Sequence, residues 1–212
     1  MRKINLVIIA CILISLLFWF SNPDTLIEYL AFSGDNLLKG RVWTLITSLF
    51  LHADPLHLLG NMLFLYVFGN TTEEDFGPAK TLVVFFLGGI LSFLLSLFFY
   101  GPLIPLIGAS AAIFTLSAIV MLTKPLKFSI LFFMPQGLLA ILYFMYNAVA
   151  VYLGAEVNVA YIAHIIGFAI GIPLGLAWSK NWFKNLLISI ALLGVYLVIT
   201  VVVIPYIFNL IT

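Results

Sequence analysis

Seven apolar segments, separated by short clusters of polar or helix-breaking residues, constrain this chain more than any other feature of its sequence. They cover approximately residues 4–20, 56–69, 79–99, 108–123, 136–153, 159–178 and 185–208. A helix that crosses a bilayer needs about 20 predominantly apolar residues. Because the hydrocarbon contains no water, backbone N–H and C=O groups there must form hydrogen bonds within the protein, as they do in a helix. The sequence therefore predicts an all-α, polytopic membrane protein with seven transmembrane helices.

The composition supports a membrane protein and argues against several other classes. Hydrophobic residues make up 64% and charged residues 8% of the 212 residues, with a mean hydropathy of +1.24. This leaves no room for a separate soluble domain, so we expect a single domain over residues 1–212 in contact with the lipid bilayer. The net charge of +1 argues against nucleic acid as a partner. The single cysteine, Cys11, excludes an internal disulfide.

The basic residues predict the orientation of the helices. With the amino-terminal end inside, two of the nine lysine and arginine residues, Lys39 and Arg41, fall in an external segment. The cytoplasmic ones are Arg2, Lys3, Lys80, Lys124, Lys127, Lys180 and Lys184. The positive-inside rule therefore predicts a cytoplasmic amino terminus and an external carboxyl terminus. We interpret the first apolar segment as a retained span, because no small-residue cleavage site follows it.

Two polar residues of complementary chemistry lie at membrane depth in different predicted helices. Ser110 lies near the outer end of the fourth segment, within GASAAIF, and His164 lies near the outer end of the sixth, within AHIIGFAIG. Such side chains are costly in hydrocarbon unless they face a protein interior or a cavity. Separately, they could be a small packing residue and a hydrogen-bonded structural histidine. Their similar depth on parallel helices favours a nucleophile and its base.

The approach to the second segment and the segment itself carry three more polar residues. His57 and Asn61 are four residues apart, so they share one helical face and enter the membrane from the same side as Ser110. The N–H groups of an imidazole and an amide are suited to stabilise a developing oxyanion. His52, which precedes this helix, is interpreted as a structural residue that braces the loop.

The sixth segment has a glycine face. Gly167 and Gly171 follow His164 on the same helical face, and such small residues permit close packing of transmembrane helices. We expect this face to press against the fourth helix and bring His164 to Ser110. No Asp or Glu falls in a predicted span, so we expect a Ser–His dyad without a third acidic member. The base would then be oriented by packing, by an aromatic ring such as Phe114, or by a neutral acceptor.

These motifs, in this order, resemble the rhomboid family of intramembrane serine proteases over nearly the whole chain. The residues that match the family pattern are His52, His57, Asn61, Gly108, Ser110, Ala163, His164, Gly167 and Gly171. The resemblance implies a six-helix core over about residues 1–180, a seventh helix appended at about 185–208, and a membrane-embedded first loop over residues 21–55. It also implies that Ser110 is the nucleophile and His164 the general base. By the same resemblance, His57 and Asn61 line the oxyanion hole.

The chain departs from the family pattern at a few positions. Ala111 follows the serine where the family commonly has glycine, and Phe114 stands where tyrosine is common. Thr44, rather than arginine, follows Trp43 in the first loop. None of these departures removes a catalytic group.

We therefore expect an intramembrane serine endopeptidase that cleaves transmembrane segments of other proteins near the outer membrane face, through an acyl-enzyme. This chemistry needs no metal or cofactor. The expected location is the cell membrane of a prokaryote. The aromatic fifth helix, with Tyr143, Phe144 and Tyr146, is expected to gate the entry of substrate.

Two other functions compete with proteolysis. One is a catalytically inactive rhomboid-like protein that binds client membrane proteins, for which the intact Ser–His pair would be unnecessary. The other is a small transporter in which His57, Asn61 and His164 form a relay. A transporter predicts polar or charged residues through the full depth of the membrane, whereas here they gather in the outer third of the predicted spans.

Overall fold

The structure, a computed structural model, describes residues 2–21, 23–155 and 160–211 and is mostly helical. The first elements are α1 (Lys3–Trp19), α2 (Pro23–Leu30), α3 (Gly34–Leu38), α4 (Thr44–Thr47) and the 3-10 helix η1 (Ser48–Phe50). They are followed by α5 (Pro55–Phe64), the π-helix η2 (Leu65–Gly69), α6 (Asn70–Phe76), α7 (Pro78–Tyr100) and α8 (Ser110–Thr123). The chain then forms β1 (Phe128–Ser129), β2 (Met134–Pro135), α9 (Gln136–Tyr152), α10 (Tyr161–Trp178), α11 (Trp182–Val198), the π-helix η3 (Ile199–Val203) and α12 (Ile204–Ile211).

Most of the expected helices are present, with ends that differ by a few residues. Within the described residues, three helices are long and apolar enough to cross a membrane: α7, α10 and the continuous helix Trp182–Asn209. Three shorter apolar helices, α1, α8 and α9, accompany them. The expected all-α fold needs one correction, because β1 and β2 pair as a short antiparallel hairpin. The expected start of the sixth helix at residue 159 lies outside the described residues.

The second helix is longer than the expected range 56–69, which treated Gly69 and Asn70 as helix-breaking residues. α5, η2 and α6 follow one another without a break, and Gly69 has helical dihedral angles of φ −66° and ψ −46°. A Cβ atom at Gly69 would lie 2.6 Å from Ile4 Cγ1, so this glycine permits close packing against α1 and does not form a turn. Residues 73–75, all acidic, therefore belong to this helix, although no acidic residue was expected in it.

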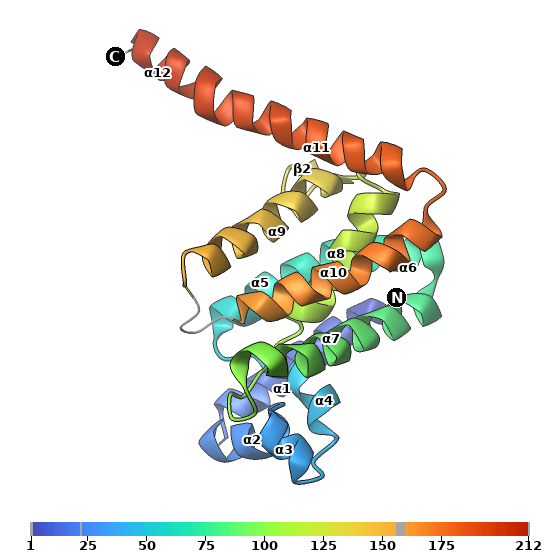
Figure 1. Ribbon diagram of the computed structural model, residues 1–212, viewed down its shortest axis with the longest axis vertical. Helices are drawn as coiled ribbons and strands as arrows, with labels where there is room; N and C mark the ends of the chain where they lie inside the picture. Colours follow the sequence, from blue (N-terminus) through green and yellow to red (C-terminus); the bar gives the residue numbers. More distant parts are fainter. Residues whose placement is uncertain (1, 22, 156–159, 212) are drawn as a thin grey trace.

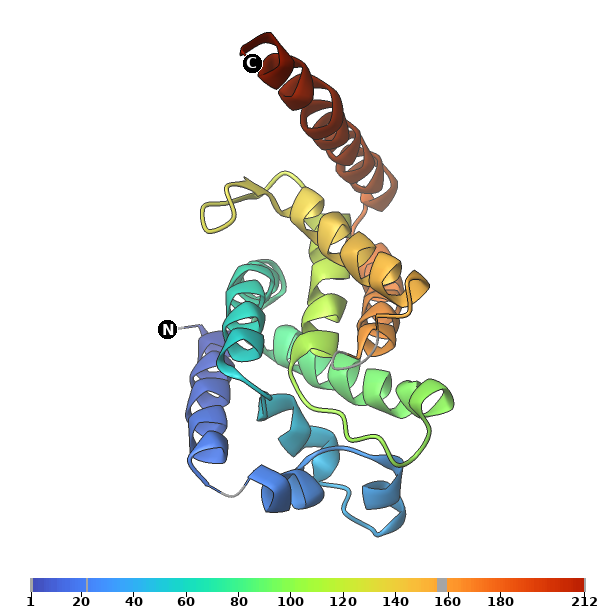
Figure 2. The ribbon, with the colours of Figure 1, turned by 90° about the vertical axis from the view of Figure 1, so that its left-hand side faces the viewer.

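Helix α8 lies at the centre of the bundle, and its residues from Ser110 to Leu122 are all buried. α7 and α10 make the most extensive contacts with it, and α9 packs against a further side (Figures 1 and 2). In α7, a Cβ atom at Gly88 would overlap the side chain of Thr115, and one at Gly89 would lie 2.6 Å from Leu49 Cδ2. Glycine in α7 therefore lets that helix approach α8 closely, as in other membrane bundles.

Helix α8 begins at Ser110 and not at residue 108 as expected. Gly108 has a φ of +109°, a left-handed conformation that favours glycine, and Ala109 is the N-cap. The N–H of Gly108 donates to the carbonyl of Ser48 at 2.9 Å, which anchors the turn before the helix. Ser110 is therefore the first residue of α8, where backbone N–H groups have no acceptor inside the helix.

The connection between α1 and α5 is a folded segment that contains α2, α3, α4 and η1. Phe32 and Leu106 exchange two backbone hydrogen bonds, of 3.1 and 2.7 Å, which tie this segment to the connection between α7 and α8. Arg41 lies inside the segment and donates to the carbonyl of Glu28 and to Asn36 Oδ1, both at 2.9 Å. An arginine before Trp43 in the sequence thus organises the loop.

The carboxyl-terminal helix projects from the bundle (Figure 1). It begins at Trp182, earlier than the expected residue 185, and most of the α11 side chains are exposed. Near its start, Asn185 Nδ2 donates to the carbonyls of Leu122 and Thr123 at 2.8 and 3.2 Å. These bonds attach the beginning of α11 to the end of α8.

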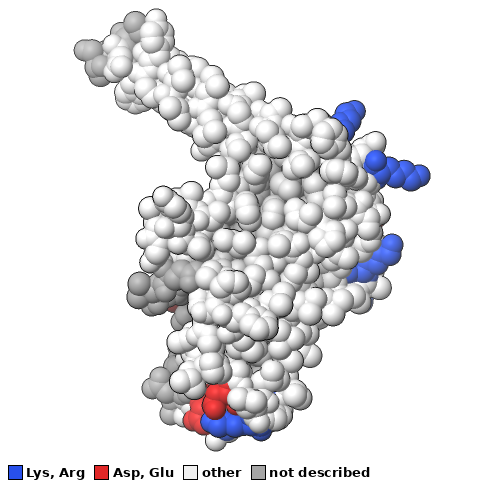
Figure 3. All heavy atoms as spheres, viewed as in Figure 1, with Lys and Arg blue, Asp and Glu red and all other residues white. Residues whose placement is uncertain are grey.

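Charged residues gather at a few places on the surface. Figure 3 shows basic side chains near the edge where α10 passes into α11, a mixed acidic and basic group over α2 and α3, and a broad uncharged face between them.

At the end of α6, Glu74 pairs with Lys127 at 3.2 Å and with Arg2 at 2.5 Å. The hydrogen bond and charge of Lys127, followed by the bond from Arg2, lower the pKa of Glu74.

Glu73 connects the second helix to the start of α1. Its carboxylate is buried and accepts hydrogen bonds from the backbone N–H groups of Lys3 and Ile4, both at 2.7 Å. Arg2, the N-cap of α1, makes no side-chain capping bond of its own. Glu73 therefore caps α1 from a different helix, at the end where a negative charge is favourable.

We expect Glu73→Ala to lower the free energy of unfolding by about 1–3 kcal/mol, because two helix N–H groups would lose a charged acceptor in a buried place. Thermal and denaturant unfolding in detergent micelles would measure this loss. Glu74→Ala is the control, since Glu74 is adjacent but largely exposed, and its pairs with Arg2 and Lys127 are partly solvated. Equal stability of the two variants would contradict the capping role.

Candidate active site

Ser110 and His164 form a hydrogen bond in the interior of the bundle. Ser110 is the first residue of α8, and His164 lies in the first turn of α10. Ser110 Oγ lies 2.6 Å from His164 Nε2, and each residue is only 7% exposed. The structure thus brings into contact the two residues that the sequence placed at similar depth.

The other ring nitrogen of His164 contacts Asn147 of α9, a residue that sequence reasoning missed. Asn147 Oδ1 lies 2.6 Å from His164 Nδ1, and Asn147 is 1% exposed. The sequence does contain a signal for this residue, because an asparagine inside an apolar span is costly unless it has a hydrogen-bond partner. The sequence analysis allows for a neutral acceptor beside His164 but does not identify it as Asn147.

Three aromatic rings stack in a column that ends on the imidazole of His164. The Phe114 ring lies 4.8 Å from the imidazole at an interplanar angle of 15°. On its other side, Phe114 stacks on Tyr143 of α9 at 3.9 Å, and Tyr143 stacks on Phe64 of α5 at 4.0 Å. The column therefore packs the imidazole in place and fills the space between α5 and α9.

The three aromatic residues expected to form a gate lie on different faces of α9. Tyr143 faces α5 through its contact with Phe64. Phe144 instead stacks on Phe168 of α10 at 4.4 Å, and Tyr146 is 63% exposed. Of these three residues, only Tyr143 is therefore positioned between α5 and α9.

The glycine face of α10 packs directly on the backbone of α8. A Cβ atom at Gly167 would overlap the carbonyl oxygen of Ala111, and one at Gly171 would overlap that of Thr115. Thr115 Oγ1 also donates to the carbonyl of Gly167 at 2.8 Å. This contact lies one to two turns beyond His164, so it sets the distance between the two helices that carry the Ser–His pair.

His57 lies beside Gly108, next to the start of α8. Its Nδ1 accepts a hydrogen bond from the N–H of Ala53 at 3.4 Å, so the proton of the neutral ring lies on Nε2. A Cβ atom at Gly108 would lie 2.9 Å from His57 Cε1 and Nε2. Gly108 therefore leaves room for an imidazole N–H donor close to Ser110.

Asn61 is buried one turn further along α5. Its Nδ2 donates to the carbonyl of His57 at 2.9 Å, which uses one of the two amide protons. Its Oδ1 is buried and has no hydrogen-bond partner among the described residues. The second amide proton of Asn61 remains a potential donor. The bond from Asn61 to the His57 carbonyl could not be predicted from the sequence pattern.

His52 links α1 to the approach to α5. Its Nδ1 lies 3.0 Å from Ser15 Oγ, and its carbonyl accepts a hydrogen bond from Trp19 Nε1 at 2.8 Å. The His52 ring also packs edge-on against His57, with 5.1 Å between the ring centroids. The residue is fully buried, so it braces the loop from which His57 enters the bundle.

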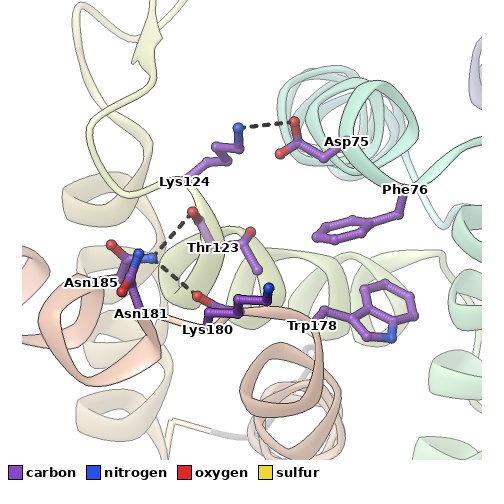
Figure 4. A pocket seen from close by; sticks show the side chains of 9 residues that line it. Asp75, Phe76, Thr123, Lys124, Trp178, Lys180, Asn181 and Asn185 are labelled. Carbon is purple, nitrogen blue, oxygen red and sulfur yellow. Dashed lines mark hydrogen bonds and ion pairs between the residues drawn. The ribbon is translucent and has the colours of Figure 1, made fainter.

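A polar cavity of about 380 Å³ lies at the opposite end of α8 from Ser110. Figure 4 shows Asp75 and Phe76 of α6, Thr123 of α8 and Trp178 of α10 around it, with Lys124 paired to Asp75. Since Ser110 and Thr123 are the two ends of α8, this cavity is about 20 Å from the Ser–His pair at 1.5 Å per residue. It is therefore separate from the candidate active site.

The fold and the site together define a class: a helical membrane protein with a serine and a histidine hydrogen-bonded in its interior. The family can be stated as well. The Rhomboid domain matches residues 39–181, more than half of the chain, so the chain belongs to the rhomboid family.

Several curated relatives are rhomboid proteases. The chain is 31% identical over 97 residues to "Rhomboid protease GlpG" of Salmonella choleraesuis (strain SC-B67). It is 30% identical over 97 residues to proteins of the same name from Salmonella newport (strain SL254) and Salmonella typhimurium (strain LT2). Each match covers 46% of this chain and 35% of the relative, so the chain spans about a third of the length of the relatives it matches.

We expect Gly167→Ala to destabilise the protein by about 1–3 kcal/mol, because the added methyl group meets the α8 backbone and must push the helices apart. Thermal unfolding in detergent would measure the loss. Gly194→Ala in α11 is a matched control, since nothing lies within 4 Å of its Cβ position. If both variants unfolded at the temperature of the wild type, close packing at Gly167 would be disproved.

Proposed function

We propose that this protein is an intramembrane serine endopeptidase that cleaves transmembrane segments of other proteins near the outer membrane face. The observation that carries the proposal is the buried 2.6 Å contact between Ser110 Oγ and His164 Nε2. Membership of the rhomboid family and similarity to proteins named rhomboid proteases support it.

In this proposal the Ser–His pair acts as nucleophile and general base. Ser110 Oγ attacks the scissile carbonyl carbon while His164 Nε2 accepts the hydroxyl proton. The tetrahedral intermediate collapses, the C–N bond breaks, and the imidazolium gives its proton to the leaving amine. Water then attacks the acyl-enzyme with His164 again as base, which releases the acid product and restores Ser110.

Three N–H groups are suited to stabilise the oxyanion. The Nε2–H of His57 lies beside Gly108, and the free amide proton of Asn61 lies one turn along the same helix. The backbone N–H of Ser110 is at the start of α8, where the helix dipole favours negative charge. We propose that His57 and Asn61 share this role, with His52, Gly108 and the aromatic column as structural support.

The proposed membrane arrangement has seven spans and a cytoplasmic amino terminus, in the cell membrane of a prokaryote. A six-helix core over about residues 1–180 would be followed by the appended helix at the carboxyl end, in one domain. The distribution of basic residues supports this orientation. Ser110 would then lie near the outer face, and the scissile segment would unwind locally, because a helical backbone shields its carbonyl groups.

The space between α5 and α9 is the proposed entry for substrate. Tyr143 and Phe64 fill it with stacked rings, which can separate without breaking any backbone hydrogen bond within α5 or α9. A transmembrane protein entering here would arrive beside the column that ends on His164.

A catalytically inactive, client-binding protein is the competing proposal. The positions of the Ser110 hydroxyl and the His164 ring favour catalysis, because a binding protein has no use for a base placed against a nucleophile. A transporter is less well supported, since His57 and His164 both lie at the Ser110 end of α8 and Asn61 is one turn along α5 from His57.

We expect Ser110→Ala and His164→Ala each to abolish cleavage of a single-span reporter protein in proteoliposomes. The wild type should also react with a fluorophosphonate probe in detergent, and both variants should lose this labelling. Ser117→Ala is the control: Ser117 is a buried serine of the same helix whose hydroxyl bonds only to the Phe114 carbonyl among the described residues.

Wild-type protein that neither cleaves the reporter nor reacts with the probe would support the inactive, client-binding alternative. Cleavage by a well-folded Ser110→Ala protein would exclude Ser110 as the nucleophile.

We expect His57→Ala and Asn61→Ala each to lower kcat by about 10²- to 10³-fold, because each would remove one oxyanion donor while the Ser110 N–H remains. Steady-state cleavage of the reporter, measured beside thermal unfolding, separates this effect from loss of fold. Wild-type turnover in the double variant would show that the two side chains are structural only.

A further inference from the structure

We propose that Asn147 is a positioning residue that holds the His164 ring in the tautomer and orientation required of the base. This inference rests on the proposed function and extends it, since neither the family resemblance nor the sequence motifs assign a partner to His164 Nδ1. The geometry consists of two hydrogen bonds of 2.6 Å, one on each ring nitrogen of His164.

The orientation of the Asn147 amide follows from its second contact. Its Nδ2 donates to the carbonyl of Tyr143 at 2.7 Å, one turn earlier in α9. A flipped amide would place Oδ1 against that carbonyl, and two acceptors would then face each other. The Tyr143 carbonyl therefore directs the Asn147 oxygen toward His164.

The amide orientation determines the position of the imidazole proton. Because Asn147 Oδ1 can only accept, His164 Nδ1 must carry the hydrogen. A neutral imidazole has one N–H, so Nε2 is left with its lone pair facing the Ser110 hydroxyl. This is the tautomer that can take the serine proton.

Burial makes the contact effective during the reaction. Asn147 is 1% exposed, so water does not compete for its oxygen. When His164 accepts the proton, the bond from Nδ1 to Asn147 becomes charge-assisted and strengthens. The amide thereby plays the orienting part that a carboxylate plays in serine protease triads, without a second charge in the membrane interior.

We expect Asn147→Leu, which keeps the approximate size but removes the acceptor, to lower kcat at least about tenfold while KM changes little. Substitutions that leave the histidine of a serine protease triad in the wrong tautomer lower kcat by up to about 10⁴-fold, so we expect the loss in Asn147→Leu to stay below that value. The rate of fluorophosphonate labelling of Ser110 should fall in parallel, because it reports the nucleophile without a bound peptide. Leu139→Ala is the control, as a buried α9 residue outside the site whose truncation also lowers stability.

Asn147→Asp tests the same contact in a second way. It retains an oxygen acceptor, so it should restore most of the activity lost in Asn147→Leu. An ionised carboxylate would stabilise the imidazolium, so the acid limb of the pH–rate profile should move to higher pH. The other titratable groups near the His164 ring in the described residues are His57 of α5, Tyr143 of α9 and Tyr161 of α10, and none changes in this comparison.

The outcomes separate this inference from the proposed function. Wild-type protein without cleavage or labelling would overturn both. Active wild type with equal kcat and labelling rate in Asn147→Leu would overturn the role of Asn147 alone. If Asn147→Leu fails to fold, an unshifted pH profile in Asn147→Asp would overturn it instead.

Discussion

Direct contact between helix backbones, made possible by glycine, is the constraint on which the rest of this structure depends. Gly167 and Gly171 of α10 press on the carbonyl oxygens of α8, and Gly88 of α7 meets α8 from another side. In lipid, apolar helices gain little from hydrophobic attraction, so such packing is a main source of association. It also sets how far His164 can lie from Ser110.

Several buried polar groups in this apolar bundle bond to a different helix or to a loop. Glu73 caps α1 from α6, His52 joins the loop to α1, and Asn147 joins α9 to α10. An unpaired polar group in such surroundings would be costly. These contacts therefore fix which helices are neighbours, whereas apolar surfaces alone would permit other arrangements.

Most of the long helices and the contact between Ser110 and His164 could be predicted from the sequence, because the lengths of apolar segments and the spacing of glycines can be read from the order of the residues. Sequence reasoning ended the second helix at Gly69, where a residue that often breaks helices instead packs closely on Ile4. It also missed Asn147, because the rotation of α9 about its axis decides which side chain meets His164. That rotation depends on tertiary packing, which no local pattern encodes.

Helix α9 carries both Tyr143, which fills the gap to α5, and Asn147, which orients His164. A movement of α9 large enough to admit a polypeptide would also draw the Asn147 oxygen away from the imidazole. Ser110 would then be least reactive while the site is most open to a polypeptide. Its reactivity would return only when α9 moves back and Asn147 again contacts His164. If the protein is the protease proposed above, the time that a transmembrane segment stays bound would then decide whether it is cleaved, because a segment that leaves quickly would dissociate before α9 returns.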